Sequence, residues 1–148
     1  MSSIRHAVAE DAAAIAELTR VAYTKWVPLI GRKPRPMTVD YSLAVQSHRF
    51  DLLHCDSVLA GLIETVVEDD CLLIENVAVR PDFQGRGFGK TLLAHAESLA
   101  REAGFHRMRL YTNRMFAVNI ALYESLGYVT EREETLEHGV LVHMAKPL

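Results

Sequence analysis

The sequence predicts an α/β fold with a mixed β-sheet, and three observations lead to this prediction. Segments with strand and helix patterns alternate in the order strand, two helices, three strands, helix, strand, helix, two strands. The middle of the chain holds a strand–helix–strand unit, a connection that joins parallel strands. Of the 148 residues, 49% are hydrophobic, enough for the core of one domain over residues 1–148.

The first half of the chain is predicted to contain three strands and two helices, at residues 3–8 (strand), 12–23 (helix), 40–48 (helix), 50–55 (strand) and 58–67 (strand). Asp11 and Asp40 stand where each helix begins and are predicted to cap it. Between the helices, residues 26–37 read WVPLIGRKPRPM. Three prolines and a glycine there exclude a continuous helix.

The second half is predicted to contain four strands and two helices, at residues 71–79 (strand), 89–103 (helix), 107–112 (strand), 117–126 (helix) and a final hairpin that turns near His138 and Gly139. One face of the 89–103 helix is apolar, with Leu92, Ala96, Leu99 and Ala103. Gly104 is predicted to end this helix. Strands 71–79 and 107–112 flank the crossover helix, so ligands are expected beyond their C-terminal ends.

Composition excludes several classes of function. A net charge of −3 argues against a nucleic-acid-binding surface, and no apolar run is long enough to cross a membrane, so a cytoplasmic location is expected. Cys55 and Cys71 have no metal-ligand spacing, and the seven histidines form no helical pair, so no metal is expected. These properties leave open whether the chain forms a homodimer.

The stretch QGRGFGKTLL, residues 84–93, predicts an anion-binding helix start. It fails the Walker pattern, because Gly85 stands one residue too close to the GKT sequence, and it fails the dinucleotide pattern, because Lys90 occupies the third glycine position. No later strand ends in an aspartate suited to Mg²⁺, which argues against a nucleotide triphosphatase. Free N–H groups at such a helix start still favour a phosphate.

Two segments, VAVRPDFQGRGFGKTLL and NIALYESLGY, together resemble the GCN5-related N-acetyltransferases (GNAT), sharply in the second half of the chain and by element order in the first. The resemblance implies a mostly antiparallel sheet of about seven strands with about four helices, whose central parallel pair is splayed for the cofactor. It also implies acetyl-CoA as co-substrate. The main chain of the loop would hold its diphosphate through Gln84, Gly85, Arg86, Gly87, Phe88, Gly89 and Lys90.

The same resemblance assigns the pantetheine arm to the strand before the loop, through Val77, Ala78 and Val79. Asn119 lies one helical turn before Tyr123 and shares its helix face, so it is a further candidate for cofactor binding. The family often has an asparagine seven residues before the tyrosine, and Phe116 replaces it here.

Transfer to an amine needs a base, because alkylamines are mostly protonated near neutral pH, and an acid, because the coenzyme A thiolate leaves more readily when it is protonated. Glu75 is the candidate base, as a carboxylate inside an apolar strand; the alternative is a structural pair with an arginine. Glu64 is the reserve candidate. Tyr123 matches the family's general-acid tyrosine, and the alternative is a tyrosine that only packs its helix against the sheet.

We expect the acceptor to be the primary amine of a small molecule, because the proline-rich segment favours a closed pocket. Alternatives are the N-terminus or a lysine of a protein, since NIALYESLGY is similar to the motif of ribosomal-protein acetyltransferases, and a non-catalytic acyl-CoA sensor. Lys25, Arg32, Lys33 and Arg35, beside Trp26, either recognise an anionic group of the acceptor or only keep a loop solvated.

Overall fold

The structure, a computed structural model, describes residues 1–148 and contains a seven-stranded sheet with the strand order β1-β2-β3-β4-β5-β7-β6. The strands are β1 Ser2–His6, β2 Arg49–Cys55, β3 Val58–Val67, β4 Leu72–Val79, β5 Arg107–Asn113, β6 Val129–Leu136 and β7 Gly139–Pro147. The helices are α1 Ala12–Tyr23, α2 Val27–Ile30, α3 Tyr41–Ser47, α4 Phe88–Glu102 and α5 Ala117–Ser125, with short 3-10 turns at Ala9–Asp11, Thr24–Trp26, Arg35–Thr38 and Pro81–Phe83. The predicted α/β fold class and strand order along the chain are confirmed.

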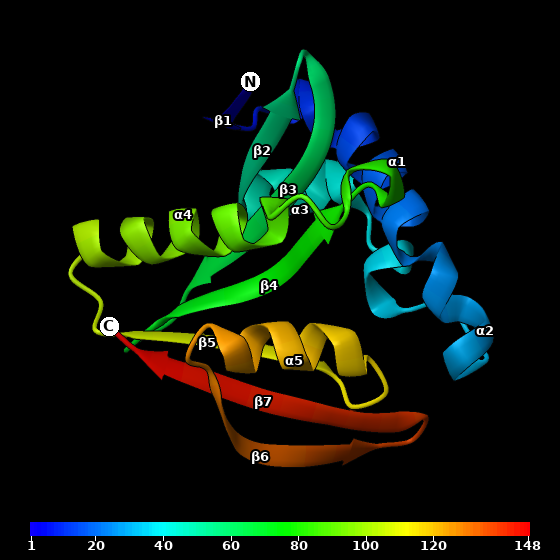
Figure 1. Ribbon diagram of the computed structural model, residues 1–148, viewed down its shortest axis with the longest axis vertical. Coiled ribbons are helices and arrows are strands. Elements are labelled where there is room, and N and C mark those ends of the chain that lie inside the picture. Colours follow the sequence, from blue (N-terminus) through cyan, green and yellow to red (C-terminus); the bar gives the residue numbers. More distant parts are fainter.

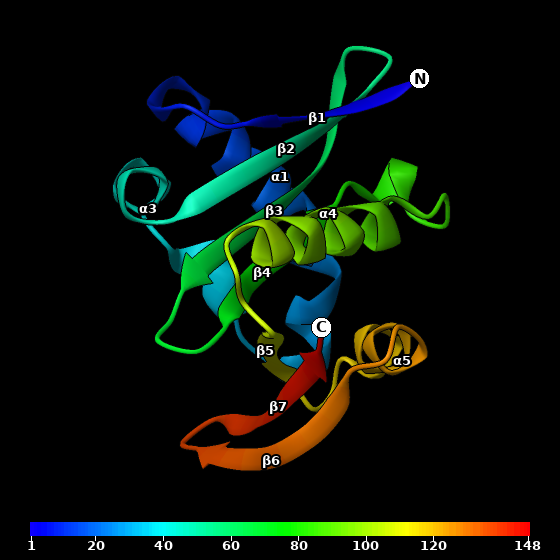
Figure 2. The same ribbon diagram turned by 90° about the vertical axis from the view of Figure 1, so that its left-hand side faces the viewer.

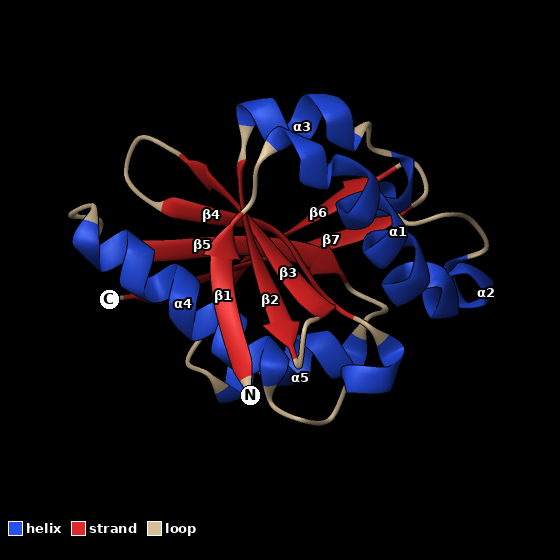
Figure 3. Ribbon diagram, turned by 90° about the horizontal axis from the view of Figure 1, so that it is seen from above, coloured by secondary structure: helices blue, strands red, loops and turns tan.

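Helices cover both faces of the sheet (Figure 3). α1 and α3 lie together on one face, where α1 contacts β3 and β4. α4 lies on the other face, against β3 and β4, and α5 lies beside β5 and β7 (Figure 1). No helix is both long and apolar enough to cross a membrane.

The sheet splits at its single parallel pair, as predicted. β4 and β5 are paired only over three positions, Leu72–Ile74 against Met108–Leu110. Beyond these positions β4 continues beside β3, whereas β5 continues beside β7 (Figures 1 and 2). The C-terminal halves of β4 and β5 are therefore not paired with each other, and the backbone edge of β4 is open there.

A β-bulge in β4 lies where this opening starts. Glu64 of β3 pairs with Asn76 and Thr65 pairs with Ile74, so Glu75 is the extra residue. Ile74 and Val77 consequently both pack into the core beneath α4, while Glu75 and Asn76 between them line a cavity on the opposite side. The bulge thus directs two consecutive polar side chains away from the core.

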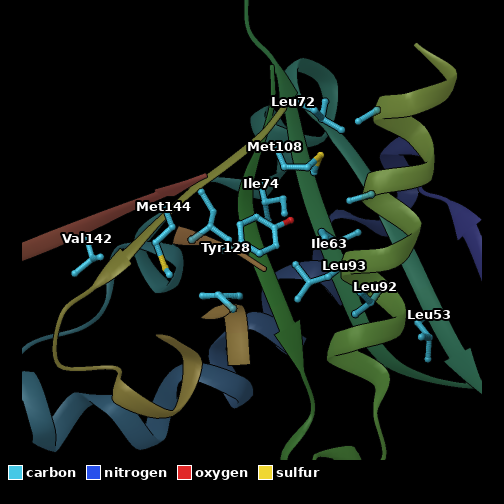
Figure 4. Packing of buried hydrophobic residues seen from close by; sticks show 14 of the residues in the cluster. Leu53, Ile63, Leu72, Ile74, Leu92, Leu93, Met108, Tyr128, Val142 and Met144 are labelled. Carbon is cyan, nitrogen blue, oxygen red and sulfur yellow. The ribbon is translucent and has the colours of Figure 1, made fainter. Parts of the chain in front are cut away.

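Two hydrophobic clusters hold the layers together. The larger cluster joins α4 to the central strands and includes Leu92, Leu93, Ile63, Met108 and Tyr128 (Figure 4). The smaller one joins α1 and α3 to β2 and β3 around Ile15, Leu18, Phe50, Leu52 and Leu62. Burial of these fully enclosed side chains is the main favourable contribution to the fold.

Two local predictions differ from the structure. Asp40 caps α3 by accepting from the N–H of Ser42, as predicted, but the prediction for Asp11 is wrong. The Asp11 carboxylate accepts from the N–H of Val8 and from Arg5, because a 3-10 turn precedes α1.

The apolar face predicted for α4 is rotated in the structure. Ala103 is exposed and Leu99 is only partly buried, whereas Leu93 and Ala100 are enclosed. The helix begins at Phe88 and packs over two strands, so its buried face is wider than a single row of residues.

The proline-rich segment contains helical turns but no continuous helix, as predicted. Pro28 lies in the first turn of the single-turn helix α2, where its missing N–H costs no hydrogen bond. Gly31, at φ 73°, adopts the left-handed conformation that ends α2. The path of residues 31–40 then runs along the edge of a cavity described below.

Candidate functional site

The loop before α4 presents a row of free backbone donors. No N–H group of residues 85–90 donates to a backbone or side-chain acceptor, and the first bond of the helix runs from Thr91 N–H to the carbonyl of Gly87. These donors and the helix dipole together favour an anion at this place.

Glycines are required in this loop by its backbone conformation. Gly85 and Gly87 have φ values of 81° and 83°, which other residues rarely adopt. A Cβ atom built on either residue would meet no protein atom within 4 Å, so the space above the loop is open. Gly89 differs, because its Cβ would lie 3.6 Å from Leu122, an ordinary contact between α4 and α5.

A cavity of about 410 Å³ extends from this loop along the open edge of β4. It brings together eleven of the residues that the sequence predicted, namely Val77, Ala78, Val79, Gln84, Gly85, Gly87, Phe88, Gly89, Lys90, Asn119 and Tyr123. Arg86 does not line this cavity; its guanidinium lies over the Phe83 ring, 4.9 Å from the centroid.

Main-chain carbonyls of β4 point into the opening. The carbonyl of Val77 is 3.4 Å from the Tyr23 hydroxyl, and the carbonyl of Val79 accepts from the Gln84 amide at 3.0 Å. The Gln84 side chain also accepts from Lys25, at 3.0 Å. This strand edge pairs with side chains rather than with β5, and an extended ligand that displaced them could form strand-like hydrogen bonds there.

Tyr123 is buried at the side of the cavity, on α5. Burial alone raises the pKa of its hydroxyl to about 12. A phenol in this environment stays protonated at neutral pH and can donate its proton to a group that develops negative charge.

A second cavity, of about 320 Å³, lies on the α1 and α3 side of the sheet. Its wall includes the predicted base Glu75, which accepts a hydrogen bond from the Tyr111 hydroxyl at 2.6 Å. Glu75 is half-buried, and its hydrogen-bond partner is a phenol of β5 rather than the arginine of the structural alternative. Burial and this bond raise the pKa of Tyr111.

Glu64 lines the same cavity. Its carboxylate is enclosed, and the His48 Nδ1 atom lies 2.6 Å from it. Burial raises the pKa of Glu64 above its ordinary value, and the bond to His48 opposes that rise. Both candidate carboxylates therefore face one space, from adjacent strands.

Three aromatic side chains lie at the boundary between the two cavities. Tyr23 lines both, and its hydroxyl donates to the Asn76 side chain at 2.7 Å. Trp26 lines the first cavity and stacks, at 4.4 Å between ring centroids, on Phe116, which lines the second. The position where the family often has asparagine is thus occupied by one half of a stacked aromatic pair.

The structure separates the basic residues that the sequence grouped together. Lys25 and Trp26 line the first cavity, Arg32 and Arg35 line the second, and Lys33 lines neither. Sequence reasoning missed Tyr23, His48 and Tyr111. Their helix and strand patterns match ordinary packing residues, so only their positions relative to Glu64 and Glu75 indicate a role in the site.

Comparisons with known proteins agree with this geometry. The family described as "Acetyltransferase (GNAT) family" matches residues 13–128. The [ribosomal protein bS18]-alanine N-acetyltransferase of Salmonella typhimurium strain LT2 is 42% identical over 73 residues, which cover 49% of each chain. A spermidine N(1)-acetyltransferase of Thermoplasma acidophilum is 30% identical over 76 residues, 51% of this chain and 47% of that protein. The chain thus spans about half the length of these curated relatives.

Among solved structures, the PaiA N-acetyltransferase from Thermoplasma acidophilum in complex with coenzyme A has a TM-score of 0.84 at 21% identity. The superposition covers 100% of this chain and 99% of that one, so the likeness is one of the whole fold. Since the family match extends over most of the chain and includes both the glycine loop and Tyr123, the chain belongs to the acetyltransferase (GNAT) family.

Proposed function

We propose that this protein is an acetyl-CoA-dependent N-acetyltransferase, formed by one domain over residues 1–148, that acetylates the primary amine of a small molecule directly. The observation that carries the proposal is the row of free N–H groups at residues 85–90. The cavity that these groups line also runs along the open edge of β4 and reaches Tyr123. An anionic diphosphate joined to an extended amide-containing arm fits this arrangement.

The residues of the loop and of β4 would bind and orient the co-substrate. The N–H groups from Gly85 to Lys90 would hold the diphosphate, and the backbone of Val77 and Val79 would pair with the pantetheine amides. Because Gln84 occupies the Val79 carbonyl, its side chain would have to move or join the contact. The co-substrate supplies an activated thioester, from which the acetyl group passes to the amine as a C–N bond forms and the C–S bond breaks.

Two side chains would move the protons of this reaction. Glu75 would take the proton that the attacking amine must lose, directly or through water, with Glu64 as the other candidate in the same cavity. Tyr123 would give its proton to the sulfur as the C–S bond breaks, since its raised pKa keeps it protonated until then.

The size of the second cavity favours a small acceptor. Pro34, Arg35 and Pro36 lie along one side of this 320 Å³ space, and Leu136 and Leu141 of the final hairpin lie along another. A space of this volume suits a small ligand.

A protein α-amine is the second candidate, favoured by the 42% identity to the bS18-alanine enzyme. That match covers only 73 residues. Acetylating the N-terminal peptide of bS18 faster than any small amine would favour this second candidate.

Thermal denaturation with acetyl-CoA, coenzyme A and ATP tests the co-substrate. A ligand that binds only the native state raises the melting temperature, so we expect the two coenzyme A compounds to raise it and ATP not to. An amine panel with detection of free thiol then tests transfer. Stabilisation by ATP alone, or no thiol release with any amine, would contradict the proposal.

A further inference from the structure

We infer that the acceptor is a small zwitterion, an amine that carries a carboxylate a few bonds away, as in a free amino acid. This inference rests on the proposed function and names its substrate class. The observation behind it is the distribution of charge in the second cavity, which has carboxylates on one wall and guanidinium groups on another.

The carboxylate wall is formed by the sheet. Glu64 of β3 is 4% exposed and Glu75 of β4 is half-buried, so both lie on the inner side of the cavity. Glu64 pairs with His48 and Glu75 accepts a hydrogen bond from Tyr111, each at 2.6 Å, but neither forms an ion pair with a lysine or an arginine. The negative charge of these carboxylates attracts a positively charged ammonium group. The ammonium group must also approach one of them to lose its proton.

The guanidinium wall is formed by the segment after α2. Arg32 and Arg35 line the cavity, are exposed, and take part in no salt bridge. Arg32 lies beside the turn between β6 and β7. A Cβ atom added to Gly139, at that turn, would be 3.9 Å from the Nη2 atom of Arg32. Two unpaired guanidinium groups at the rim favour an anionic group and disfavour a polyamine.

One phenol oxygen connects the two walls and sets their separation. The Tyr111 hydroxyl donates to Glu75 at 2.6 Å and lies 3.4 Å from the Arg35 Nη1 atom. A carboxylate at Arg35 and an amine at Glu75 would therefore be close neighbours. A free amino acid has its ammonium and carboxylate groups a few bonds apart, whereas a peptide N-terminus has an uncharged amide in place of the carboxylate.

The test uses matched sets of acceptors. Each L-amino acid is compared with its primary amide and with the amine that lacks the carboxyl group, at fixed acetyl-CoA, by release of free thiol. We expect at least one free amino acid to have a kcat/KM about tenfold or more above its amide, because the amide loses a charge-assisted hydrogen bond.

The variants Arg32→Gln and Arg35→Gln should reduce that preference, whereas Lys33→Gln should keep it. Lys33 belongs to the same exposed segment but does not line the cavity, so it is the matched control. The rise in melting temperature with acetyl-CoA should be the same in all three variants, which shows that folding and the first cavity are intact.

Three results would overturn the inference. These are equal rates for acids and amides, a preference that survives both arginine substitutions, and acetylation of other amines or peptide N-termini with no turnover of any free amino acid. Each of these leaves the proposed N-acetyltransferase activity standing. That activity fails separately, if acetyl-CoA does not stabilise the protein and no amine is acetylated.

Discussion

At the scale of single residues, the sequence identifies reactive groups but not their partners. Glu75 is recognisable as a carboxylate within an apolar strand. Its hydrogen bond comes from Tyr111, a residue 36 positions later in the chain. The bulge that turns Glu75 toward the second cavity arises from the pairing of β3 with β4, which no local pattern reveals.

Replacing Tyr123 by phenylalanine should lower kcat on the order of 100-fold, because a general acid contributes about that much, with little change in acetyl-CoA affinity. Steady-state kinetics and calorimetric titration would measure the two quantities. The control is Tyr128→Phe, since Tyr128 is also a buried tyrosine without a hydroxyl partner but does not line the first cavity. Equal turnover in Tyr123→Phe and the unaltered protein would exclude the acid role.

Replacing Glu75 by glutamine should lower kcat on the order of 100-fold, and replacing Glu64 by glutamine should have a smaller effect. The reason is that Glu75 is half-buried on the open half of β4, whereas Glu64 is enclosed. Both substitutions preserve side-chain shape, so pre-steady-state kinetics on the two variants compare them directly. The reverse ranking would identify Glu64 as the base.

At the scale of elements, the loop and the start of α4 are the best-predicted part of the site. Left-handed Gly85 and Gly87 and the free N–H groups that follow are adjacent in sequence, so the pattern QGRGFG contains nearly all the information about the proposed anion site. Arg86 is the one residue of the predicted loop that does not line the cavity, because its side chain lies over Phe83.

Replacing Gly87 by alanine should destabilise the protein by about 1 kcal/mol, because alanine is strained at positive φ, and should also weaken acetyl-CoA binding. Gly104→Ala is the matched control. Gly104 has φ 85°, lies after the other end of α4, and also has open space around it. Chemical denaturation should show a similar loss of stability in both variants. Weaker acetyl-CoA binding in Gly104→Ala as well would show that helix stability, not the loop, controls affinity.

In the segment of residues 24–40, the sequence does not predict the short helical turns that the structure contains. Its prolines and glycine correctly exclude a long helix, yet they do not reveal that a helical turn continues from α1 through α2. They also do not reveal that Arg32 and Arg35 reach the cavity while Lys33 does not. Short turns of this kind are held by tertiary contacts, and their own hydrogen bonds are too few to specify them.

At the scale of the whole molecule, charge pairs between elements make stability depend on pH. Asp11, the last residue of the 3-10 turn before α1, pairs with Arg5 of β1 at the edge of the sheet. This hydrogen bond, followed by that from the N–H of Val8, holds the pKa of Asp11 at about 2, below the ordinary 3.8. A carboxyl group whose pKa is lowered by folding stabilises the fold at any pH above its pKa in the unfolded chain. For Asp11 this contribution is lost as the pH falls from about 4 to about 2.

We therefore expect the free energy of unfolding to fall less steeply between about pH 5 and pH 2.5 in Asp11→Asn than in the unaltered protein. Urea denaturation at several pH values would measure this slope. Glu10→Gln changes an exposed neighbour and should leave the slope unchanged. A slope in Asp11→Asn equal to that of the unaltered protein would show that other carboxylates govern acid unfolding.

By itself the sequence determined the α/β fold class, the strand order along the chain and the position of the glycine loop with its free N–H groups. Each of these depends on residues that are neighbours in the chain or repeat at a regular spacing. Only the tertiary structure decided that Glu64, Glu75, Tyr111 and Arg35 surround one cavity and that Tyr23 lies between it and the site next to Tyr123. The physical reason is that the splay of β4 from β5 and the bulge at Glu75 are properties of paired strands, so they exist only once distant segments have come together.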